Sequence, residues 1–137
     1  MIIDHICFAV KDIRKGIEEW RSTFGYHQFT EQVTNSRQQV KVVFLAKPGS
    51  IDVKLIEPLK ENKNIRNFVD RGGGFHHLCF KCNDLESSIE ELSSKGVMTM
   101  VPPQPGEAFE NEKIAFLLTK FGVNVELIDT DKRAGKL

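Results

Sequence analysis

Hydrophobic and polar positions follow one order along the chain, and that order occurs twice. Residues 2–10 are apolar and rich in β-branched side chains, which is typical of a strand. Asp12 is placed to cap a helix that Gly25 can end. The apolar stripe of this helix consists of Ile13, Ile17, Trp20 and Phe24. Three more strands are predicted over 26–34, 40–46 and 51–57, so the first unit is β-α-β-β-β.

The second unit repeats this order after a connection. Ile65, Phe68 and Val69 predict a short linking helix, and we interpret the three glycines at 72–74 as a flexible joint. The unit then continues with a strand over 75–81, a helix capped by Asp84 and ended by Gly96, strands over 97–101, 113–119 and 123–129, and a proline-rich loop over 102–111.

The two units align without a gap. His77 follows His5 by 77 − 5 = 72 residues, and the same offset relates many other identical positions. It places His5, Cys7, Phe8, Asp12, Lys41, Phe44 and Leu55 on His77, Cys79, Phe80, Asp84, Lys113, Phe116 and Leu127. Because these matches fall at strand and helix landmarks, they indicate a duplicated module. We therefore predict module 1 over 1–58, a linker over 59–74, module 2 over 75–129 and a polar, mobile tail over 130–137.

These modules predict the fold class. Each unit alone would leave one face of its sheet open. Pairing the units gives an α+β fold in which two tandem βαβββ modules form a curved mixed sheet around a shared cup, with the helices outside. The 137 residues are enough for this single domain, 1–137, and no more.

Four polar side chains are predicted to point into the cup. His5 and His77 occupy equivalent places on the first strands, and Lys54 and Glu126 are equivalent on the last strands. By strand alternation, Lys54 and Glu126 point away from their apolar neighbours. Two imidazoles and a carboxylate suit a divalent ion such as Zn, Co, Ni, Mn or Fe. We therefore predict His5, His77 and Glu126 as metal ligands that leave coordination positions open for a substrate.

Composition limits the cellular compartment and the binding partners that we expect. The formal net charge is zero, which gives no reason to expect nucleic acid or an anionic membrane as a partner. There is no apolar run of bilayer length and no basic-then-apolar leader. The three cysteines are an odd number, so we expect reduced thiols and a cytoplasmic protein. Cys79 and Cys82 are interpreted as ordinary strand cysteines rather than as a metal or redox pair.

Several segments together resemble the vicinal oxygen chelate superfamily. They are residues 4–10 (DHICFAV), 55–59 (LIEPL), 74–78 (GFHHL), 113–117 (KIAFL) and 125–127 (VEL). The resemblance is strongest to the branch of methylmalonyl-CoA epimerases and glyoxalases, and it covers nearly the whole chain apart from the tail. It implies four metal ligands, at His5, Lys54, His77 and Glu126. Lys54 departs from the pattern, because that branch places Glu or Gln there. Lys41 falls where some epimerases place an acidic residue.

Lys54 leaves three arrangements open, because an ammonium group beside a divalent ion is repelled or loses its proton. Lys54 can swing aside while His5, His77 and Glu126 hold the metal. It can stay in the cup, pair with Glu126 and replace the charge of the metal. It can also act, deprotonated, as a base beside a bound metal.

Two functions follow from these arrangements. In the first, the chain is a glyoxalase- or epimerase-like enzyme, a lyase or isomerase that moves a proton next to a carbonyl or thioester, with Glu126 and Lys54 as catalytic residues. In the second, it is a metal-free protein that binds a small molecule in the cup. Lys41 and Lys113 would contact the substrate if they face inward. We interpret His76 and His27 as structural, with His76 facing the helices, and expect a homodimer.

Overall fold

The computed structural model describes residues 1–137 and has the predicted α+β architecture. The elements, in chain order, are β1 (Ile2–Ala9), α1 (Ile13–Phe24), β2 (His27–Gln28), β3 (Val33–Asn35), β4 (Val40–Ala46), β5 (Asp52–Pro58), α2 (Lys63–Asp70), β6 (Gly74–Lys81), α3 (Leu85–Ser94), β7 (Met98–Gly106), the 3-10 helix η1 (Glu107–Phe109), β8 (Glu112–Leu118) and β9 (Asn124–Ile128).

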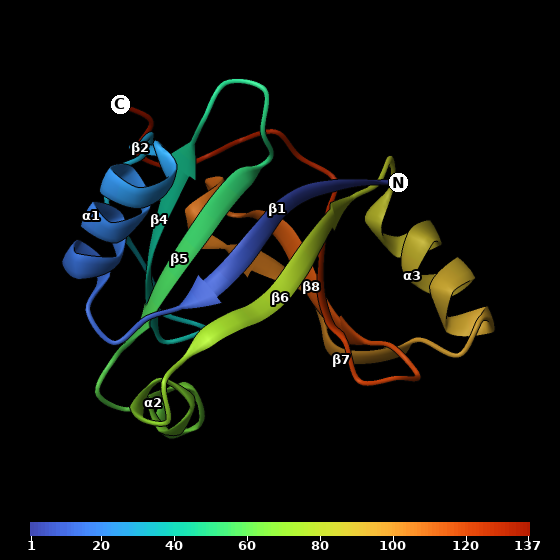
Figure 1. Cartoon of the computed structure of the whole chain (residues 1–137). Coiled ribbons are helices and arrows are strands. Elements are labelled where there is room, and N and C mark those ends of the chain that lie inside the picture. The colour runs from blue at the N-terminus through green and yellow to red at the C-terminus, as the bar shows by residue number, and fades with distance from the viewer.

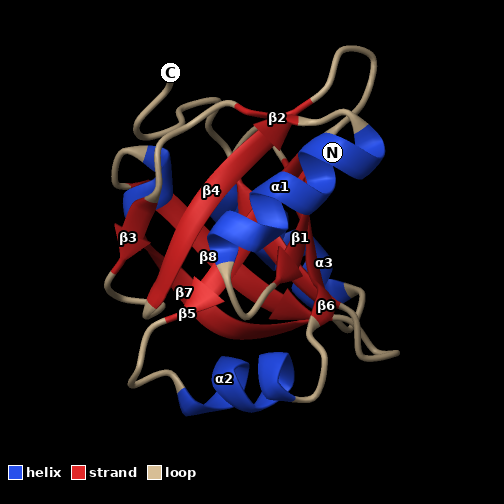
Figure 2. Ribbon diagram, turned by 60° about the vertical axis from the view of Figure 1, so that its left-hand side comes forward, coloured by secondary structure: helices blue, strands red, loops and turns tan.

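The strands form one mixed sheet in the order β2-β4-β5-β1-β6-β9-β8-β7, with β3 paired to β4. β1 and β6 lie side by side at its centre as an antiparallel pair (Figure 1). Each is flanked by a parallel neighbour, β5 beside β1 and β9 beside β6. The open sheet is strongly curved, and Figure 2 shows it wrapping around an interior. Across this interior Ser36, which follows β3, donates from its backbone nitrogen and its hydroxyl to Glu107 of η1, over 2.7 and 2.6 Å.

The offset of 72 also relates the elements. β1 and β6 begin at residues 2 and 74, α1 and α3 at 13 and 85, β4 and β8 at 40 and 112, and β5 and β9 at 52 and 124. The predicted helix caps are confirmed in both units. Asp12 accepts hydrogen bonds from the backbone of Arg14 and Lys15, and Asp84 accepts one from Ser87.

α1 and α3 lie on the outer face of the sheet, as predicted, whereas α2 packs against the inner cluster. The inner face is apolar around the site. α1 packs on an outer cluster that includes Val43 and Leu55, and α3 packs on one that includes Leu127. A separate inner cluster includes Val42 and Phe109. Residues alternate between these clusters along β4, β5 and β9, which directs Lys54 and Glu126 inward, opposite to Leu55 and Leu127.

The proline-rich segment is part of a strand rather than the predicted loop. β7 runs to Gly106 and pairs with β8, including Gln104 with Ile114 and Pro105 with Lys113. It lies at the end of the sheet order, where a residue without a backbone N–H is tolerated on the open side. The irregular part starts only at η1. The predicted strand over 26–34 is likewise interrupted, into β2 and β3.

The last eight residues, predicted as a mobile tail, are attached to the domain at several points. Leu137 donates to the carbonyl of Phe29 over 3.0 Å, and Ala134 donates to that of Ala108 over 2.9 Å. Arg133 is buried to 6% exposure. Because a buried guanidinium requires charged partners, the ion pairs of Arg133 described below hold the tail in place.

One residue of the glycine segment before β6, Gly73, lies very close to β1. Gly73 has a φ of +65°, and a Cβ atom there would lie 2.5 Å from the carbonyl oxygen of Ala9. Only glycine fits this approach of the linker to β1. The helices give no candidate for a membrane span, since none is both long and apolar enough.

Candidate functional site

Four charged or polar side chains meet on the inner face of the sheet, as alternation predicted. His5, Lys54, His77 and Glu126 come from β1, β5, β6 and β9, which are consecutive in the sheet. All four are buried, with exposed fractions of 0, 4, 1 and 0%. Their strands belong to both halves of the chain, so the site exists only because the central β1–β6 pair joins the halves.

The carboxylate of Glu126 is the centre of this group. Its Oε1 lies 3.0 Å from Nε2 of His5, 3.1 Å from Nε2 of His77 and 3.0 Å from Nζ of Lys54. Its Oε2 lies 3.3 Å from the same Nζ. Burial alone would raise the pKa of Glu126, but the Lys54 charge and the histidine hydrogen bonds hold it well below its usual value. Burial would lower the pKa of Lys54, and the charge of Glu126 outweighs this and raises it. The pair is therefore ionic.

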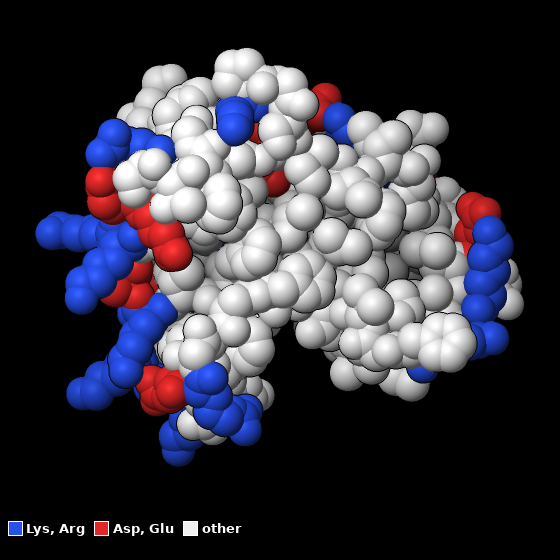
Figure 3. Space-filling view, in the orientation of Figure 1, with Lys and Arg blue, Asp and Glu red and all other residues white.

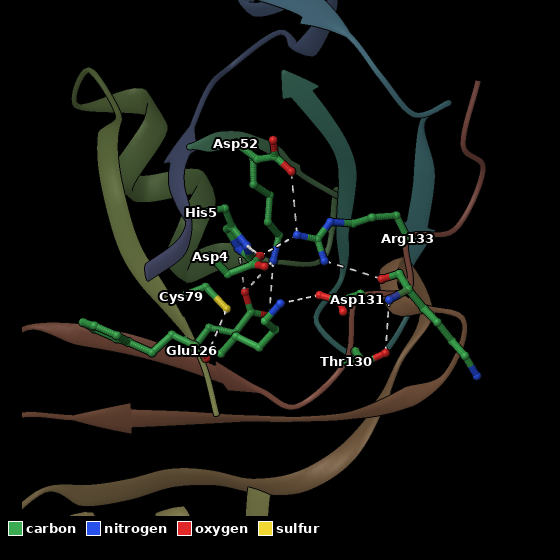
Figure 4. A network of polar contacts seen from close by, with 12 residues as sticks. Asp4, His5, Asp52, Cys79, Glu126, Thr130, Asp131 and Arg133 are labelled. Atoms are coloured by element: carbon green, nitrogen blue, oxygen red, sulfur yellow. Dashed lines mark hydrogen bonds and ion pairs between the residues drawn. The ribbon is translucent and has the colours of Figure 1, made fainter. Parts of the chain in front are cut away.

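His5 is held from its other side by the C-terminal tail. Its Nδ1 lies 2.7 Å from Oδ2 of Asp4, and that same oxygen is paired with Arg133. Figure 4 shows Arg133 between Asp4 and Asp52, and the distance to Asp52 is 3.8 Å. Burial would raise the pKa of Asp4, but His5 and Arg133 together lower it. The chain of contacts therefore runs from the tail through Asp4 and His5 to Glu126.

Aromatic rings enclose this chain of contacts. The guanidinium carbon of Arg133 lies 4.4 Å from the ring centre of Phe44 and 5.2 Å from that of Phe109. Phe109 is fully buried and also lies 5.4 Å from Nζ of Lys54. η1 thus closes one end of the cup, beneath the tail.

His77 is held by a second histidine. Its Nδ1 lies 2.7 Å from Nδ1 of His76, so one of the two nitrogens carries the proton and the other accepts it. Burial lowers the pKa of His77 to about 3, although Glu126 opposes this effect. Burial and the charge of Lys54 lower the pKa of His76. Near neutral pH both rings are therefore uncharged.

A cavity of about 380 Å³ opens onto this group. Its titratable lining residues are Lys54, His76 and His77, whereas His5 and Glu126 lie behind them. The walls are Val40, Val42, Ile56, Ile65, Met100, Val101, Phe116 and Leu117, with side-chain amides from Asn35, Gln38, Asn64 and Asn124. α2 and β7 contribute opposite parts of the lining, and Figure 3 shows the surface hollowed between them.

The placement of His76 corrects its reading as a residue that faces the helices. Along the β1–β6 pair, Cys7 opposes His77 and Phe8 opposes Phe75, so His76 is the extra residue of a β-bulge. A bulge re-aims the side chain it carries. His76 consequently lines the cavity instead of following the alternation of the strand.

Lys41 and Lys113 lie outside the cup, so the condition for their expected contact with the substrate, an inward orientation, is not met. Nζ of Lys41 lies 3.4 Å from Glu57, and Nζ of Lys113 lies 4.0 Å from Glu86 on α3. Their side chains are 44% and 63% exposed. The assumption that β4 and β8 keep the orientation of the first strands fails, since Val42 beside Lys41 points inward.

Three site residues were missing from the sequence interpretation: Asp4, Phe109 and Arg133. Phe109 could have been suspected as an isolated aromatic residue in a polar loop. Asp4 has the offset of 72 as its signal, because 4 + 72 = 76 makes it the mate of His76. Arg133 lies in a short polar tail with several other charged residues, and nothing in the sequence distinguishes it from them.

The spacing of the donor atoms suits a divalent metal, but the position of Lys54 does not. His5, His77 and Glu126 each offer one atom, and these lie within 4.8 Å of one another, as three ligands require. The ammonium of Lys54, however, binds both oxygens of the carboxylate that would have to serve as a ligand. With Lys54 in this position, the residues present do not fit a divalent ion.

Comparison with known proteins agrees with this fold. Residues 4–116 match the sequence model of the glyoxalase/bleomycin resistance protein/dioxygenase superfamily. The chain is 33% identical to the uncharacterized protein YqjC of Bacillus subtilis over 130 residues, which are 93% of this chain and 91% of YqjC. The crystal structure of methylmalonyl-CoA epimerase from Mycobacterium tuberculosis superposes with a TM-score of 0.81 and 32% identity, covering 93% of this chain and 86% of the epimerase.

A methylmalonyl-CoA epimerase in complex with methylmalonyl-CoA and NH4+ is also similar, with a TM-score of 0.78 and 27% identity over 98% of this chain and 96% of that one. The chain therefore belongs to the glyoxalase/bleomycin resistance/dioxygenase superfamily, also called the vicinal oxygen chelate superfamily, and the predicted resemblance is confirmed. The superfamily relationship leaves the activity open, because one scaffold carries many chemistries.

Proposed function

We propose that the chain is an epimerase-like enzyme that removes and returns a proton at the carbon next to an acyl thioester. The observation that carries this proposal is the titratable lining of the cavity, which consists of one cation, Lys54, and two neutral imidazoles, His76 and His77. A cation stabilises the negative charge of an enolate, and a neutral imidazole accepts a proton.

The proton transfer can be written with these residues. The C–H bond beside the carbonyl breaks, its proton goes to the His76–His77 pair, and its electron pair leaves an enolate whose oxygen is stabilised by Lys54. Lys54 and His77 lie on β5 and β6, on either side of β1. A proton delivered from solvent to the opposite face of the carbon inverts the centre. Exchange of the captured proton with solvent before its return to the same face labels the carbon without inversion.

This mechanism changes the role first expected for Glu126. Its side chain has no exposed surface and lies behind Lys54 and His77, so it does not contact a ligand in the cavity. We infer that Glu126 acts through Lys54, whose ammonium it holds and orients. Lys54 keeps the catalytic role that the sequence predicted.

An acyl-CoA thioester is the substrate class that we favour. Related epimerases have been crystallised with such ligands, one of them with methylmalonyl-CoA. The cavity is large enough for a short acyl chain, and its amide side chains match the amide-rich arm of a pantetheine. Lys63 and Arg66 on α2 flank two residues that line the cavity, Asn64 and Ile65, and Figure 3 shows basic side chains gathered at that end of the molecule. They could meet phosphate groups there.

Deuterium exchange tests this function. The purified chain is incubated in D2O with a panel of 2-substituted acyl-CoA thioesters, including methylmalonyl-CoA, and the proton at C2 is followed by NMR. We expect exchange catalysed by the wild type and by Lys41→Gln, the matched lysine on the outer face. We expect the rate to fall by about 10²- to 10⁴-fold in His77→Gln. Exchange with no substrate of the panel would contradict the proposal.

A metal-free binding protein is the second candidate, and one observation favours it. The cavity is lined by no carboxylate, and the lowered pKa values of His76 and His77 make both rings weak bases. In that case the cup would hold a small anionic ligand on Lys54 without turning it over. Saturable binding of an acyl-CoA without deuterium exchange would identify this function.

The predicted homodimer belongs to the same proposal. The outer faces of β1 and β6 lie between α1 and α3 without a covering helix (Figure 1). Ile2, Ile3 and Phe75 on these strands are exposed. We infer that two copies associate through this face, and light scattering after gel filtration would give the mass.

A further inference from the structure

We propose that the ammonium of Lys54 is a built-in replacement for a divalent metal, and that this single side chain keeps metal out of the site. The proposal does not depend on the reaction. It concerns which cation neutralises Glu126, and it holds for an enzyme and for a binding protein alike.

The contacts of Lys54 support this inference. Its Nζ lies 3.0 and 3.3 Å from the two oxygens of Glu126, and the side chain is 5% exposed. Oε1 of Glu126 is also the atom that faces Nε2 of both His5 and His77. The ammonium therefore bonds to the carboxylate at the point where the potential metal ligands converge.

An ammonium group has three N–H donors, which can rotate about the bond to the side chain. In this structure Lys54 makes contacts with the two oxygens of Glu126, and the ring of Phe109 lies 5.4 Å from Nζ. Lys54 is also part of the cavity lining. The donor that remains can bond to a ligand oxygen, which is the interaction that a metal ion would otherwise provide.

The charges of Lys54 and Glu126 give the same result. Both side chains are buried, and their charges of +1 and −1 cancel. A divalent ion added to this pair would bring the sum to 1 − 1 + 2 = +2, whereas the same ion with a neutral residue at position 54 would give −1 + 2 = +1. Unbalanced buried charge is unfavourable, so the lysine and the metal exclude each other.

Metal analysis tests the proposal without reference to activity. The wild type, Lys54→Gln and Lys54→Glu are expressed in medium supplemented with Zn, Co, Ni or Mn and purified without a chelator. Lys41→Gln is the control, since it removes a lysine from the outer face of the neighbouring strand. Metal content is measured by mass spectrometry, and circular dichroism confirms that each variant is folded. Cobalt titration followed by visible absorption reports ligand binding directly.

We expect little metal in the wild type and in Lys41→Gln, and about one ion per chain in Lys54→Gln or Lys54→Glu, with cobalt bands only in these two. Near-stoichiometric metal in the wild type would overturn the proposal, and this measurement needs no variant to fold. Folded Lys54 variants that bind no metal would overturn it as well, because something other than the lysine would then exclude the ion. Neither result depends on whether deuterium exchange is observed.

Discussion

Asp4 and His76 occupy equivalent bulges in the two halves of the molecule. They are 72 positions apart, and each is the residue without an opposite partner where β1 pairs with β6. Each also lies 2.7 Å from Nδ1 of the histidine that follows it, His5 or His77. A β-bulge thus places a hydrogen-bond partner next to each site histidine. The two partners differ, because Asp4 forms an ion pair with Arg133 whereas His76 lines the cavity.

Because of this difference, one of two matched substitutions should mainly affect stability and the other should mainly affect the rate of proton exchange. Asp4→Asn removes the charge beside Arg133 and should lower the free energy of unfolding by about 1–3 kcal/mol. His76→Asn alters a half-buried residue and should change it by about 1 kcal/mol or less. The rate of proton exchange should instead fall by about 10²- to 10⁴-fold in His76→Asn, if the ring carries the proton. Urea denaturation and the exchange assay check both effects, and equal stability losses in the two variants would contradict this division.

The tail should contribute to stability through Arg133. Arg133→Met keeps an apolar side chain against Phe44 and Phe109 but leaves Asp4 without its cation, so we expect a loss of about 3 kcal/mol. Lys132→Met is the matched control, because its pair with Glu112 is on the surface. Thermal and urea midpoints of the two variants should differ clearly. Similar midpoints would mean that the tail does not hold the site.

Lysines inside and outside the cup should behave differently. Lys41→Gln and Lys113→Gln remove exposed charges and should leave proton exchange at the wild-type rate. Lys54→Gln removes the donor to the enolate and should lower the rate by about 10²- to 10³-fold, measured in the presence of a chelator. Loss of exchange in either outer variant would mean that the substrate extends onto the outer face of the sheet.

Strand alternation and the repeat predicted much of this molecule. They placed both helix caps, the central strands and the inward direction of His5, Lys54, His77 and Glu126 from local information alone. Such positions are predictable because a strand has a strict period of two and the offset of 72 transfers the pattern between halves.

The errors arose where that period is interrupted or where partners come from far along the chain. The bulge at His76 interrupts the alternation of the strand. Its side chain therefore points to the cavity and not in the direction that alternation predicts. The orientation of Lys41 could not be inferred from that of β1, because which residues of a strand face inward is set separately for each strand. Arg133 acquires its role from Asp4, 129 residues away, and a contact of this separation leaves no local pattern.

Stability should fall in mildly acidic solution because of His77. Burial lowers its pKa to about 3. Below about pH 6.5 this histidine is therefore protonated in the unfolded chain but remains unprotonated in the folded chain. The contribution of His77 is thus complete above that pH and is lost as pH falls, by about 1.4 kcal/mol per pH unit. The lowered pKa of Glu126 adds a further loss below its usual range. Urea denaturation of the wild type and His77→Gln should show a shallower dependence in the variant, and identical slopes would contradict the assignment.

The central claim is that the ammonium of Lys54 is the counter-ion of Glu126, and a double-mutant cycle tests it most directly. The free energy of unfolding is measured in a chelator for the wild type, Lys54→Met, Glu126→Gln and the double variant. The partly exposed pair Lys41 and Glu57 serves as a control cycle, with an expected coupling below about 1 kcal/mol. Each single change in the cup should lower stability by about 3–5 kcal/mol, because it leaves a buried charge unpaired. The double variant should recover much of that loss and give a coupling of about 2 kcal/mol or more, whereas losses that add within about 0.5 kcal/mol would contradict the claim.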